Sequence, residues 1–366
     1  MKTVNQIKIC FEDLNIDGYH KVVKITDEAS GLKAIIALHD LTLGPALGGT
    51  RIYPYANWDE ALYDVLRLSK GMTYKAAVSN VGLGGGKSVI LCDPKTGITD
   101  DQLRAFGKAV EAFNGDYICA EDMGCTTDML KIVREETKYV TGLAHQNSSG
   151  NPSPYTAYGV FRGIQASLMQ AFGSDSVQGK TVAIQGMGSV GQALADYLFW
   201  AGARLILSDP DQEKAERLAH RYGGKTCPIN QIMSVKCDVL APCAIGGIIN
   251  NETINNLNCR IVAGAANNQL QNDNHASALM QKGIIYAPDF LINSGGLINV
   301  SHEIEPEGYD PVLARDKIDA IYEQILTTYR ISQESRCSTH QAAVELASYR
   351  LRYGVNKRTT APVFHH

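Results

Sequence analysis

The hydrophobic pattern of the first 145 residues predicts a mixed α/β arrangement. Apolar residues recur at strand spacing in some segments and at helical spacing in others. Asn57 and Glu60 have the spacing of a capping pair, and a helical stripe from Ala61 to Leu68 follows them. The predicted elements are strands over 21–25, 32–38, 88–92 and 117–120, a helix that begins near 57, and a helix over 100–113. The last of these strands ends at Glu121 and Asp122.

The rest of the chain alternates strands and helices more regularly. A turn-rich stretch over 147–154 indicates the passage between two domains. The predicted strands are 181–184, 204–208, 239–240, 261–263 and 284–286, and the predicted helices are 156–172, 190–201, one long helix through 318–329, and 339–353. Alternation of this kind predicts a parallel, doubly wound sheet of the Rossmann type. The predicted fold class is therefore α/β with two domains.

Size and charge agree with a two-domain enzyme. A chain of 366 residues exceeds what one hydrophobic core usually holds. Its 45% hydrophobic and 20% charged residues are typical of globular enzymes. Because the net charge is -4, the chain offers no surface that neutralises phosphates, and no nucleic-acid partner is expected.

Cysteine usage and the N-terminus indicate the compartment. The nine cysteines include no C-x-x-C pair and have irregular spacing, so neither a metal site nor a disulfide framework is predicted. Reduced thiols fit a cytoplasmic protein. The first residues lack a signal-peptide pattern and no apolar run approaches the length of a membrane span, so no membrane partner is expected.

A glycine pattern in the second part predicts a dinucleotide site. Gly186, Gly188 and Gly191 have the G-x-G-x-x-G spacing between a predicted strand and a predicted helix. Such glycines allow a tight turn, a close approach of the pyrophosphate, and close helix–strand packing. Asp209 ends the next strand, where a carboxylate accepts hydrogen bonds from the adenosine ribose. No Arg or Lys comes directly after it to bind a 2′-phosphate, so NAD is expected rather than NADP.

Two lysines in the first part are candidates for catalysis. Lys87 follows three glycines, which predict a turn that another group approaches closely. Lys75 lies twelve residues earlier in apolar surroundings. A lysine held near another cation and away from water loses its proton more readily, and it can then act as a base near neutral pH. Asp122 is a candidate proton partner, and the other lysine is free to hold a substrate carboxylate.

Beyond these features, nine runs of residues resemble the leucine dehydrogenase branch of the amino-acid dehydrogenases, which also include phenylalanine, valine and, more distantly, glutamate enzymes. The runs keep the family's order from about residue 20 to 300. They are Leu43–Gly49, Gly71–Lys75, Gly84–Lys87, Ala120–Asp122, Ser149–Pro154, Gly186–Gly188, Ala241–Ala244, Ala266–Leu270 and Asn293–Gly296.

The resemblance implies roles for individual residues. Lys87 matches the lysine that activates water, Asp122 the acid that assists proton transfer, and Lys75 the lysine that binds the substrate α-carboxylate. Thr156 matches the threonine that orients the nicotinamide, and Asn268 an asparagine that contacts the substrate. The implied cofactor-binding residues are Thr156, Gly186, Met187, Gly188, Ser189, Val190, Gly191, Asp209, Cys243, Ala244 and Asn268. The implied substrate-binding residues are Lys75, Leu47, Gly48, Gly49, Met72, Ala120, Asn268, Leu297 and Val300.

The implied reaction is the reversible, NAD-dependent oxidative deamination of L-leucine and other branched-chain amino acids to 2-oxo acids, with release of ammonium. The implied pocket is apolar, so a charged side chain would lose its hydration there without gaining a partner. One methylene is worth only about 1–3 kcal/mol, so phenylalanine, valine and tryptophan enzymes stay open as alternatives. Thr50 replaces a more usual alanine beside the expected pocket.

The resemblance also implies the domain roles and an assembly. Residues 1–145 are expected to form the substrate and oligomerisation domain, to which the C-terminal helices, about 335–366, return. Residues 146–334 are expected to bind NAD. Members of this family assemble as homo-oligomers, often octamers.

Four other interpretations remain. The lysines can be exposed surface residues, as most lysines are. The glycine pattern can serve packing alone. Alternatively, the protein can bind the cofactor without turnover, as a nicotinamide-dependent sensor would. A phosphate-binding loop before Ser88 would need glycine where Val81 stands, which makes a phosphotransferase a poor fit.

Overall fold

The structure is a computed structural model that describes residues 9–93, 95, 97–143 and 148–365, and it divides into two compact units. Unit 1 consists of Met1–Asn151, Val300–Asp310 and Ser348–His366, as far as these segments are described. Unit 2 consists of Pro152–Asn299 and Pro311–Ala347. The expected domain boundary at 145/146 lies outside the described residues. No helix in the described part of the chain is long and apolar enough to cross a membrane.

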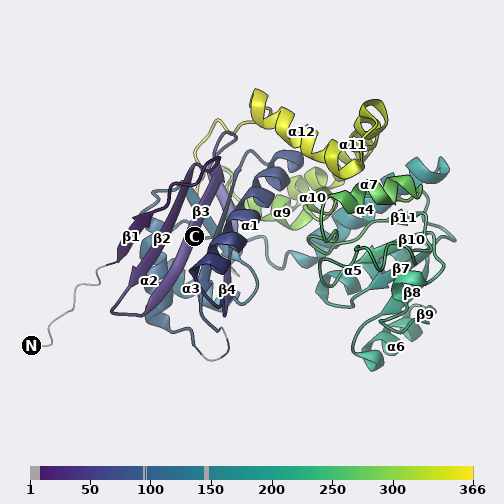
Figure 1. Cartoon of the computed structure of the whole chain (residues 1–366), viewed down its shortest axis with the longest axis horizontal. Helices are drawn as coiled ribbons and strands as arrows, with labels where there is room; N and C mark the ends of the chain where they lie inside the picture. The colour runs from purple at the N-terminus through teal and green to yellow at the C-terminus, as the bar shows by residue number, and fades with distance from the viewer. Residues whose placement is uncertain (1–8, 94, 96, 144–147, 366) are drawn as a thin grey trace, which may run out of the picture. The chain divides into compact units, whose positions relative to one another are not determined.

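Unit 1 contains a six-stranded mixed sheet with the order β1-β2-β3-β5-β4-β6 (Figure 1). The strands are β1 (Cys10–Asp13), β2 (Lys21–Asp27), β3 (Leu32–Asp40), β4 (Ala46–Tyr53), β5 (Gly84–Leu91) and β6 (Tyr117–Glu121). β1, β2, β3 and β5 pair antiparallel, whereas β4 pairs parallel with both β5 and β6. The carboxyl ends of β4, β5 and β6 therefore meet at one edge of the sheet.

Helices cover both faces of this sheet. The helices that lie wholly in unit 1 are α1 (Trp58–Ser79), α2 (Asp100–Glu111), α3 (Thr127–Arg134) and the short η2 (His302–Ile304). α1 packs on one face, where Ala61 and Val65 join a core cluster with Val89 of β5. α2 and α3 pack on the opposite face through Phe106 and Leu130. The side chain of Asn57 accepts a hydrogen bond from the backbone N–H of Glu60 and begins α1, as predicted.

Unit 2 contains a parallel sheet with the order β12-β11-β10-β7-β8-β9. The strands are β7 (Thr181–Gln185), β8 (Arg204–Ser208), β9 (Lys225–Thr226), β10 (Val239–Pro242), β11 (Ile261–Val262) and β12 (Ile285–Tyr286). The chain runs outwards from β7 through β8 and β9, and then crosses to the other side through β10, β11 and β12. This is the doubly wound Rossmann order, which confirms the predicted fold class.

The remaining helices surround that sheet or lead out of unit 2. They are α4 (Ser153–Phe172), α5 (Ser189–Trp200), α6 (Gln212–Arg221), η1 (Ile232–Ser234), α7 (Asn274–Gln281), α8 (Asp289–Ile292), α9 (Gly295–Ser301), α10 (Pro311–Asp319), α11 (Ile321–Ser335) and α12 (Thr339–Tyr353). The predicted single helix through 318–329 is wrong. It is interrupted at Ala320, next to Asp319, whose carboxylate binds Tyr158 and Arg162 of α4.

The predicted glycine turn before Lys87 is also wrong. Gly84, Gly85 and Gly86 lie inside β5, and none of them has a positive φ. Another part of the chain does approach these glycines closely, as expected, but they lie in a strand and not in a turn. A Cβ on Gly85 would lie 2.1 Å from the backbone N of Thr73, so the missing side chain lets α1 pack directly on the strand. Strands β1, β4 and β9 were not predicted.

Candidate active site

The structure brings the predicted catalytic pair of unit 1 into contact. Lys87 lies in β5, and Asp122 directly follows β6. The Nζ atom of Lys87 is 2.8 Å from Oδ2 of Asp122. Lys87 is only 6% exposed, so it is not a surface lysine. A buried amine in direct contact with a carboxylate can exchange a proton with it.

Arg51 extends this pair into a chain of charges that the sequence did not reveal. Its Nε donates to the same Oδ2 of Asp122 at 3.1 Å, and its Nη1 donates to Oδ2 of Asp64 at 2.9 Å. Tyr55 and Arg67 also donate to Asp64, at 2.7 and 3.2 Å. Arg51 lies in β4, which was not predicted as a strand, so nothing placed its side chain beside Asp122.

The electrostatics favour a charged Asp122. Burial opposes ionisation, but the positive charges of Lys87 and Arg51 outweigh it and hold the pKa of Asp122 below its usual range. The pKa of Asp64 is also lowered, because its hydrogen bond from Tyr55 and the charge of Arg51 overcome burial. Arg51 therefore links two carboxylates that both remain ionised near neutral pH.

A glycine lets Asp122 approach β4. A Cβ on Gly49 would lie 2.5 Å from the backbone O of Glu121 and 2.8 Å from Cβ of Asp122. Any side chain at this position would push the carboxylate away. Glycine is therefore needed at position 49 for steric reasons.

Strand register places several predicted substrate-binding residues on one face of the sheet. Leu47 pairs with Gly85, and Gly49 pairs with Ala120, so these positions share the face that α1 covers. Lys87, two residues after Gly85 in β5, lies on the same face. Leu47 is buried at 3% exposure.

The other predicted substrate-binding residues of unit 1 occupy different positions. Met72 and Lys75 are half-buried on α1, on either side of Thr73. Gly48 alternates to the opposite face of β4. Val300, at the end of α9, is buried at 9% exposure.

Thr50 does not lie beside the expected pocket. It is 1% exposed on the opposite face of β4, where Ser88 donates a hydrogen bond to its Oγ1 at 2.9 Å. The hydroxyl of Tyr117 lies 2.9 Å from Oγ of Ser88 and 2.8 Å from the carbonyl O of Gly48. Period-two alternation along β4 explains the error, since Thr50 follows Gly49 and must face the other way.

In unit 2 the glycine loop has the geometry that a dinucleotide needs. Gly186 begins the turn after β7 with φ of 93°, and a Cβ on Gly191 would lie 2.0 Å from the carbonyl O of Gly186. A Cβ on Gly188 would meet nothing within 4 Å, so the loop is open where a pyrophosphate would approach. α5 begins at Ser189, directly after Gly188, and offers backbone N–H groups there. Met187 is fully buried, and Val190 lies in the first turn of α5.

Other predicted cofactor-binding residues lie next to this loop. A Cβ on Gly186 would lie 2.6 Å from Cβ of Ala244, and one on Gly191 would lie 3.6 Å from Cβ of Cys243. Both residues follow β10, which neighbours β7 at the point where the strand order reverses. Ligands of doubly wound sheets bind at this point.

Asp209 also lies at the glycine loop, but it has a basic neighbour. Its Oδ2 accepts from the backbone N–H of Met187 at 2.7 Å, and Nζ of Lys214 is 3.5 Å from the same oxygen. Burial opposes ionisation of Asp209, but these contacts lower its pKa. No basic residue directly follows Asp209 in the sequence, but Lys214 of α6 lies beside it in the structure.

The remaining predicted site residues of unit 2 are Thr156, Leu297 and Asn268. Thr156 lies in α4 against the start of α9, since a Cβ on Gly296 would be 2.7 Å from its Oγ1. Leu297, in α9, is buried at 8% exposure. Asn268 is exposed after β11 with φ of 50°, a left-handed conformation that asparagine tolerates better than most residues.

In the part of the chain that the structure describes, no group of three or more His, Cys, Asp or Glu side chains is arranged to hold a metal ion.

Removal of Arg51 should shift an acid transition. Because the pKa of folded Asp122 is lowered, its ion pairs stabilise the fold above the unfolded pKa, and this stability is lost as the pH falls through the folded pKa. In Arg51→Met the folded pKa should rise, so acid unfolding, followed by circular dichroism, should begin at higher pH. Arg51→Lys should recover part of the shift. An unchanged acid midpoint in Arg51→Met would show that Arg51 does not act on Asp122.

The Rossmann sheet with its open glycine loop defines unit 2 as a nucleotide-binding dehydrogenase domain. Comparisons with known proteins agree. A family model for the Glu/Leu/Phe/Val dehydrogenase dimerisation domain matches residues 19–139, and one for glutamate/leucine/phenylalanine/valine dehydrogenase matches residues 211–357. A model of the NAD-binding domain of D-isomer specific 2-hydroxyacid dehydrogenases matches residues 160–261.

Full-length relatives extend the match. The chain is 46% identical to leucine dehydrogenase of Thermoactinomyces intermedius, over 96% of this chain and 95% of that protein. It is 44% identical to phenylalanine dehydrogenase of Lysinibacillus sphaericus, over 92% and 90%. The crystal structure of L-tryptophan dehydrogenase from Nostoc punctiforme superposes with a TM-score of 0.82 at 43% identity, and covers 92% of this chain and 97% of that one.

The chain belongs to the Glu/Leu/Phe/Val dehydrogenase family. It is an amino-acid dehydrogenase that acts on CH–NH2 donors, in the branch that contains the leucine, phenylalanine and tryptophan enzymes.

Proposed function

We propose that the protein catalyses the NAD-dependent, reversible oxidative deamination of L-leucine and other branched-chain amino acids. The observation that carries this proposal is the buried Lys87–Asp122 pair, on the same sheet face as the apolar Leu47. Unit 1 would bind the amino acid and unit 2 the cofactor. The balanced reaction converts L-amino acid, NAD⁺ and water into 2-oxo acid, ammonium, NADH and a proton.

In the proposed mechanism, the glycine loop over Gly186–Gly191 would hold NAD, which would supply the hydride acceptor for Cα, so that the amino acid becomes an iminium. Lys75 binds the α-carboxylate. Lys87 first passes its own proton to Asp122, and the neutral amine then takes a proton from a water molecule, whose oxygen attacks the iminium carbon. Asp122, 2.8 Å from the amine, exchanges the proton with Lys87 and delivers it to the departing nitrogen. Arg51 keeps Asp122 oriented through the shared Oδ2 contact.

Substrate choice follows from the lining of unit 1. Leu47 has no charge to offer a distal carboxylate, and burial of an unpaired carboxylate is costly. Glutamate should therefore be a poor substrate. Among apolar amino acids, the 46% identity to a leucine enzyme and 44% to a phenylalanine enzyme do not separate the two classes. The aliphatic preference is our proposal, and the aromatic one is the alternative.

A spectrophotometric screen of the L-amino acids with NAD and with NADP tests the proposal. We expect NADH formation to be fastest with leucine, isoleucine and valine, slower with phenylalanine and tryptophan, and absent with glutamate. A higher kcat/KM for phenylalanine or tryptophan than for leucine would show that the enzyme prefers aromatic amino acids. Cofactor binding without turnover of any amino acid would contradict the dehydrogenase mechanism itself.

The cofactor preference depends on Asp209. Its carboxylate would bind the adenosine ribose of NAD and repel a 2′-phosphate. In Asp209→Ala we expect kcat/KM for NAD to fall about 10- to 100-fold, the size of a lost charged hydrogen bond. Activity with NADP should rise at the same time, because Lys214 then has no carboxylate partner there. Glu213→Ala, an exposed change in the first turn of α6, is the matched control. An unchanged NAD-to-NADP ratio in Asp209→Ala would refute this role.

We also propose a homo-oligomer that assembles through unit 1. The match to a dimerisation domain over residues 19–139 supports this assembly. β1 is an edge strand whose four residues are all exposed, and such edges pair readily with another copy. Light scattering on the purified protein should give a mass that is a multiple of 39.7 kDa, with an octamer as the expected size. A monomeric mass would contradict the proposal.

A further inference from the structure

Two cysteines of unit 2 lie at matching positions on neighbouring parallel strands. β10 and β11 pair with Val239 opposite Ile261. Cys237 and Cys259 each come two residues before that pair, at the amino ends of the two strands. The pairing extends to them, because the backbone N–H of Cys237 donates to the carbonyl O of Asn258 at 3.1 Å. The two cysteines therefore lie next to each other just before the two strands begin.

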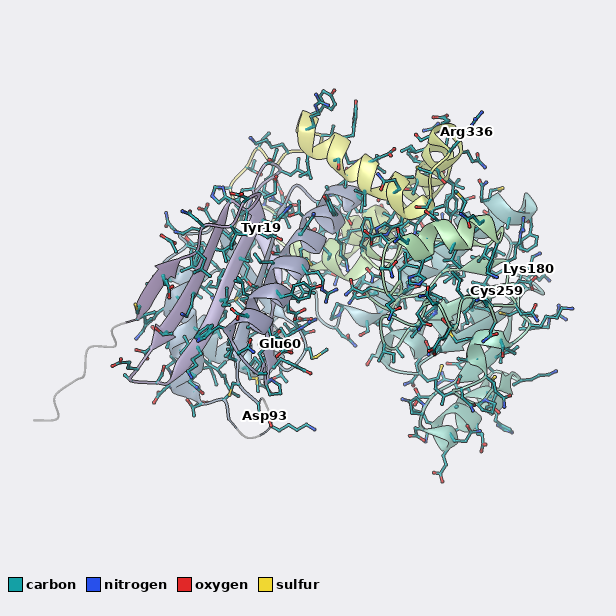
Figure 2. All side chains as sticks on the ribbon, in the orientation of Figure 1. Tyr19, Glu60, Asp93, Lys180, Cys259 and Arg336 are labelled. Carbon is teal, nitrogen blue, oxygen red and sulfur yellow. The ribbon has the colours of Figure 1, made fainter. Side chains whose placement is uncertain are left out.

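The geometry between them suits a disulfide. Neighbouring strands are about 4.8 Å apart, and the Cα atoms of disulfide-linked cysteines are usually about 4.4–6.8 Å apart. The thiols of Cys237 and Cys259 lie close enough to interact in the reduced protein. Both side chains are half-buried against the core cluster of unit 2, so a small oxidant can reach them (Figure 2 labels Cys259).

One of the two thiols is prepared to react first. The interaction with Cys237 lowers the pKa of Cys259, although burial opposes this effect. The thiolate is the form of cysteine that attacks oxidants and disulfides. Cys259 therefore fits the attacking role, and Cys237, in contact with it, fits the resolving role.

We propose that Cys237 and Cys259 form a reversible dithiol–disulfide site that a peroxide closes and a dithiol reductant reopens. The Cys259 thiolate attacks one oxygen of hydrogen peroxide, which gives a sulfenic acid and releases hydroxide. The sulfur of Cys237 then attacks the sulfenic sulfur, loses its proton, and releases water. The two thiols together lose two electrons, and the peroxide is reduced to water.

This site is at the opposite edge of the sheet from the proposed cofactor loop. Cys237 and Cys259 precede the amino ends of their strands, whereas Gly186 follows the carboxyl end of β7. The disulfide should therefore leave amino-acid dehydrogenase activity nearly unchanged. It should raise the melting temperature by roughly 5 °C, because the link restricts the unfolded segment between the two cysteines.

The test uses the full-length protein treated with hydrogen peroxide and digested without reduction. We expect mass spectrometry to find a linked peptide that contains Cys237 and Cys259 and that disappears with dithiothreitol. The melting temperature of the treated protein should rise, and the same treatment should not raise it in Cys237→Ser. Cys227→Ser, a buried cysteine of the same core cluster, should keep both the link and the rise.

The single variants separate the two roles. In Cys237→Ser, Cys259 has no resolving partner and should proceed to sulfinic or sulfonic acid. In Cys259→Ser, Cys237 should be oxidised more slowly than Cys259 in the other variant. The proposal is overturned if no 237–259 link forms at a peroxide level that oxidises other cysteines, or if other cysteine pairs link instead. Neither result would affect the proposed dehydrogenase function, which is measured separately with L-leucine and NAD.

Discussion

Lys87→Met is expected to lower kcat for L-leucine about 100- to 10,000-fold, the usual contribution of a general base. Methionine keeps the length and the apolar stem of the buried side chain, but it cannot take a proton from water. Asp122 keeps one partner in this variant, because Arg51 still donates to its Oδ2 at 3.1 Å. The loss should therefore appear in kcat while the melting temperature stays close to that of the parent protein.

The matched control is Lys33→Met, an exposed lysine on β3 of the same sheet, which should retain full activity. The two variants have the same change in charge and composition, so a difference in their activities must arise from the position of the lysine. A second measurement separates chemistry from binding, since the KM for L-leucine should change much less than kcat if Lys75 still binds the carboxylate. Turnover of Lys87→Met at the parent rate would rule out Lys87 as the base and with it the proposed mechanism.

The parallel sheet of unit 2 was predictable because local and global signals agree there. Its strands other than β9 are short, largely apolar runs, and the glycine pattern falls between a strand and a helix, where the Rossmann motif requires it. The residues of the glycine loop could also be placed, because one motif fixes their relative positions. The approach of Lys214 to Asp209 could not be placed, since it depends on how the first turn of α6 folds back.

The active face of unit 1 was less predictable because it depends on strand pairing between distant segments. β4 contains two glycines and few β-branched residues, so its pattern did not indicate a strand. Because β4 was not predicted, the sequence did not indicate that Thr50 and Arg51 face opposite sides of the sheet. Lys87 and Asp122 were identified as candidates from the residues themselves, whereas their specific roles came from the family motifs and stay predictions. Arg51 was missed because only the parallel register of β4 and β6 brings it to Asp122.

Gly85→Ala is expected to cause a large loss of stability in unit 1. The added Cβ would lie 2.1 Å from both the backbone N and Oγ1 of Thr73, and backbone cannot move aside as a flexible side chain can. Overpacking of this kind costs about 1–3 kcal/mol or more in the free energy of unfolding. That corresponds to a fall in melting temperature of about 2–4 °C for each kcal/mol.

The same substitution should also lower activity, because displacement of Thr73 moves its neighbours Met72 and Lys75 on α1. Gly71→Ala is the control on the same helix. A Cβ there meets nothing within 4 Å, and alanine favours a helix over glycine by about 1 kcal/mol, so this variant should be as stable as the parent protein or more so. Urea denaturation of both variants measures the difference. If Gly85→Ala unfolds at the same urea concentration as Gly71→Ala, Gly85 is not needed for the direct packing of α1 on β5.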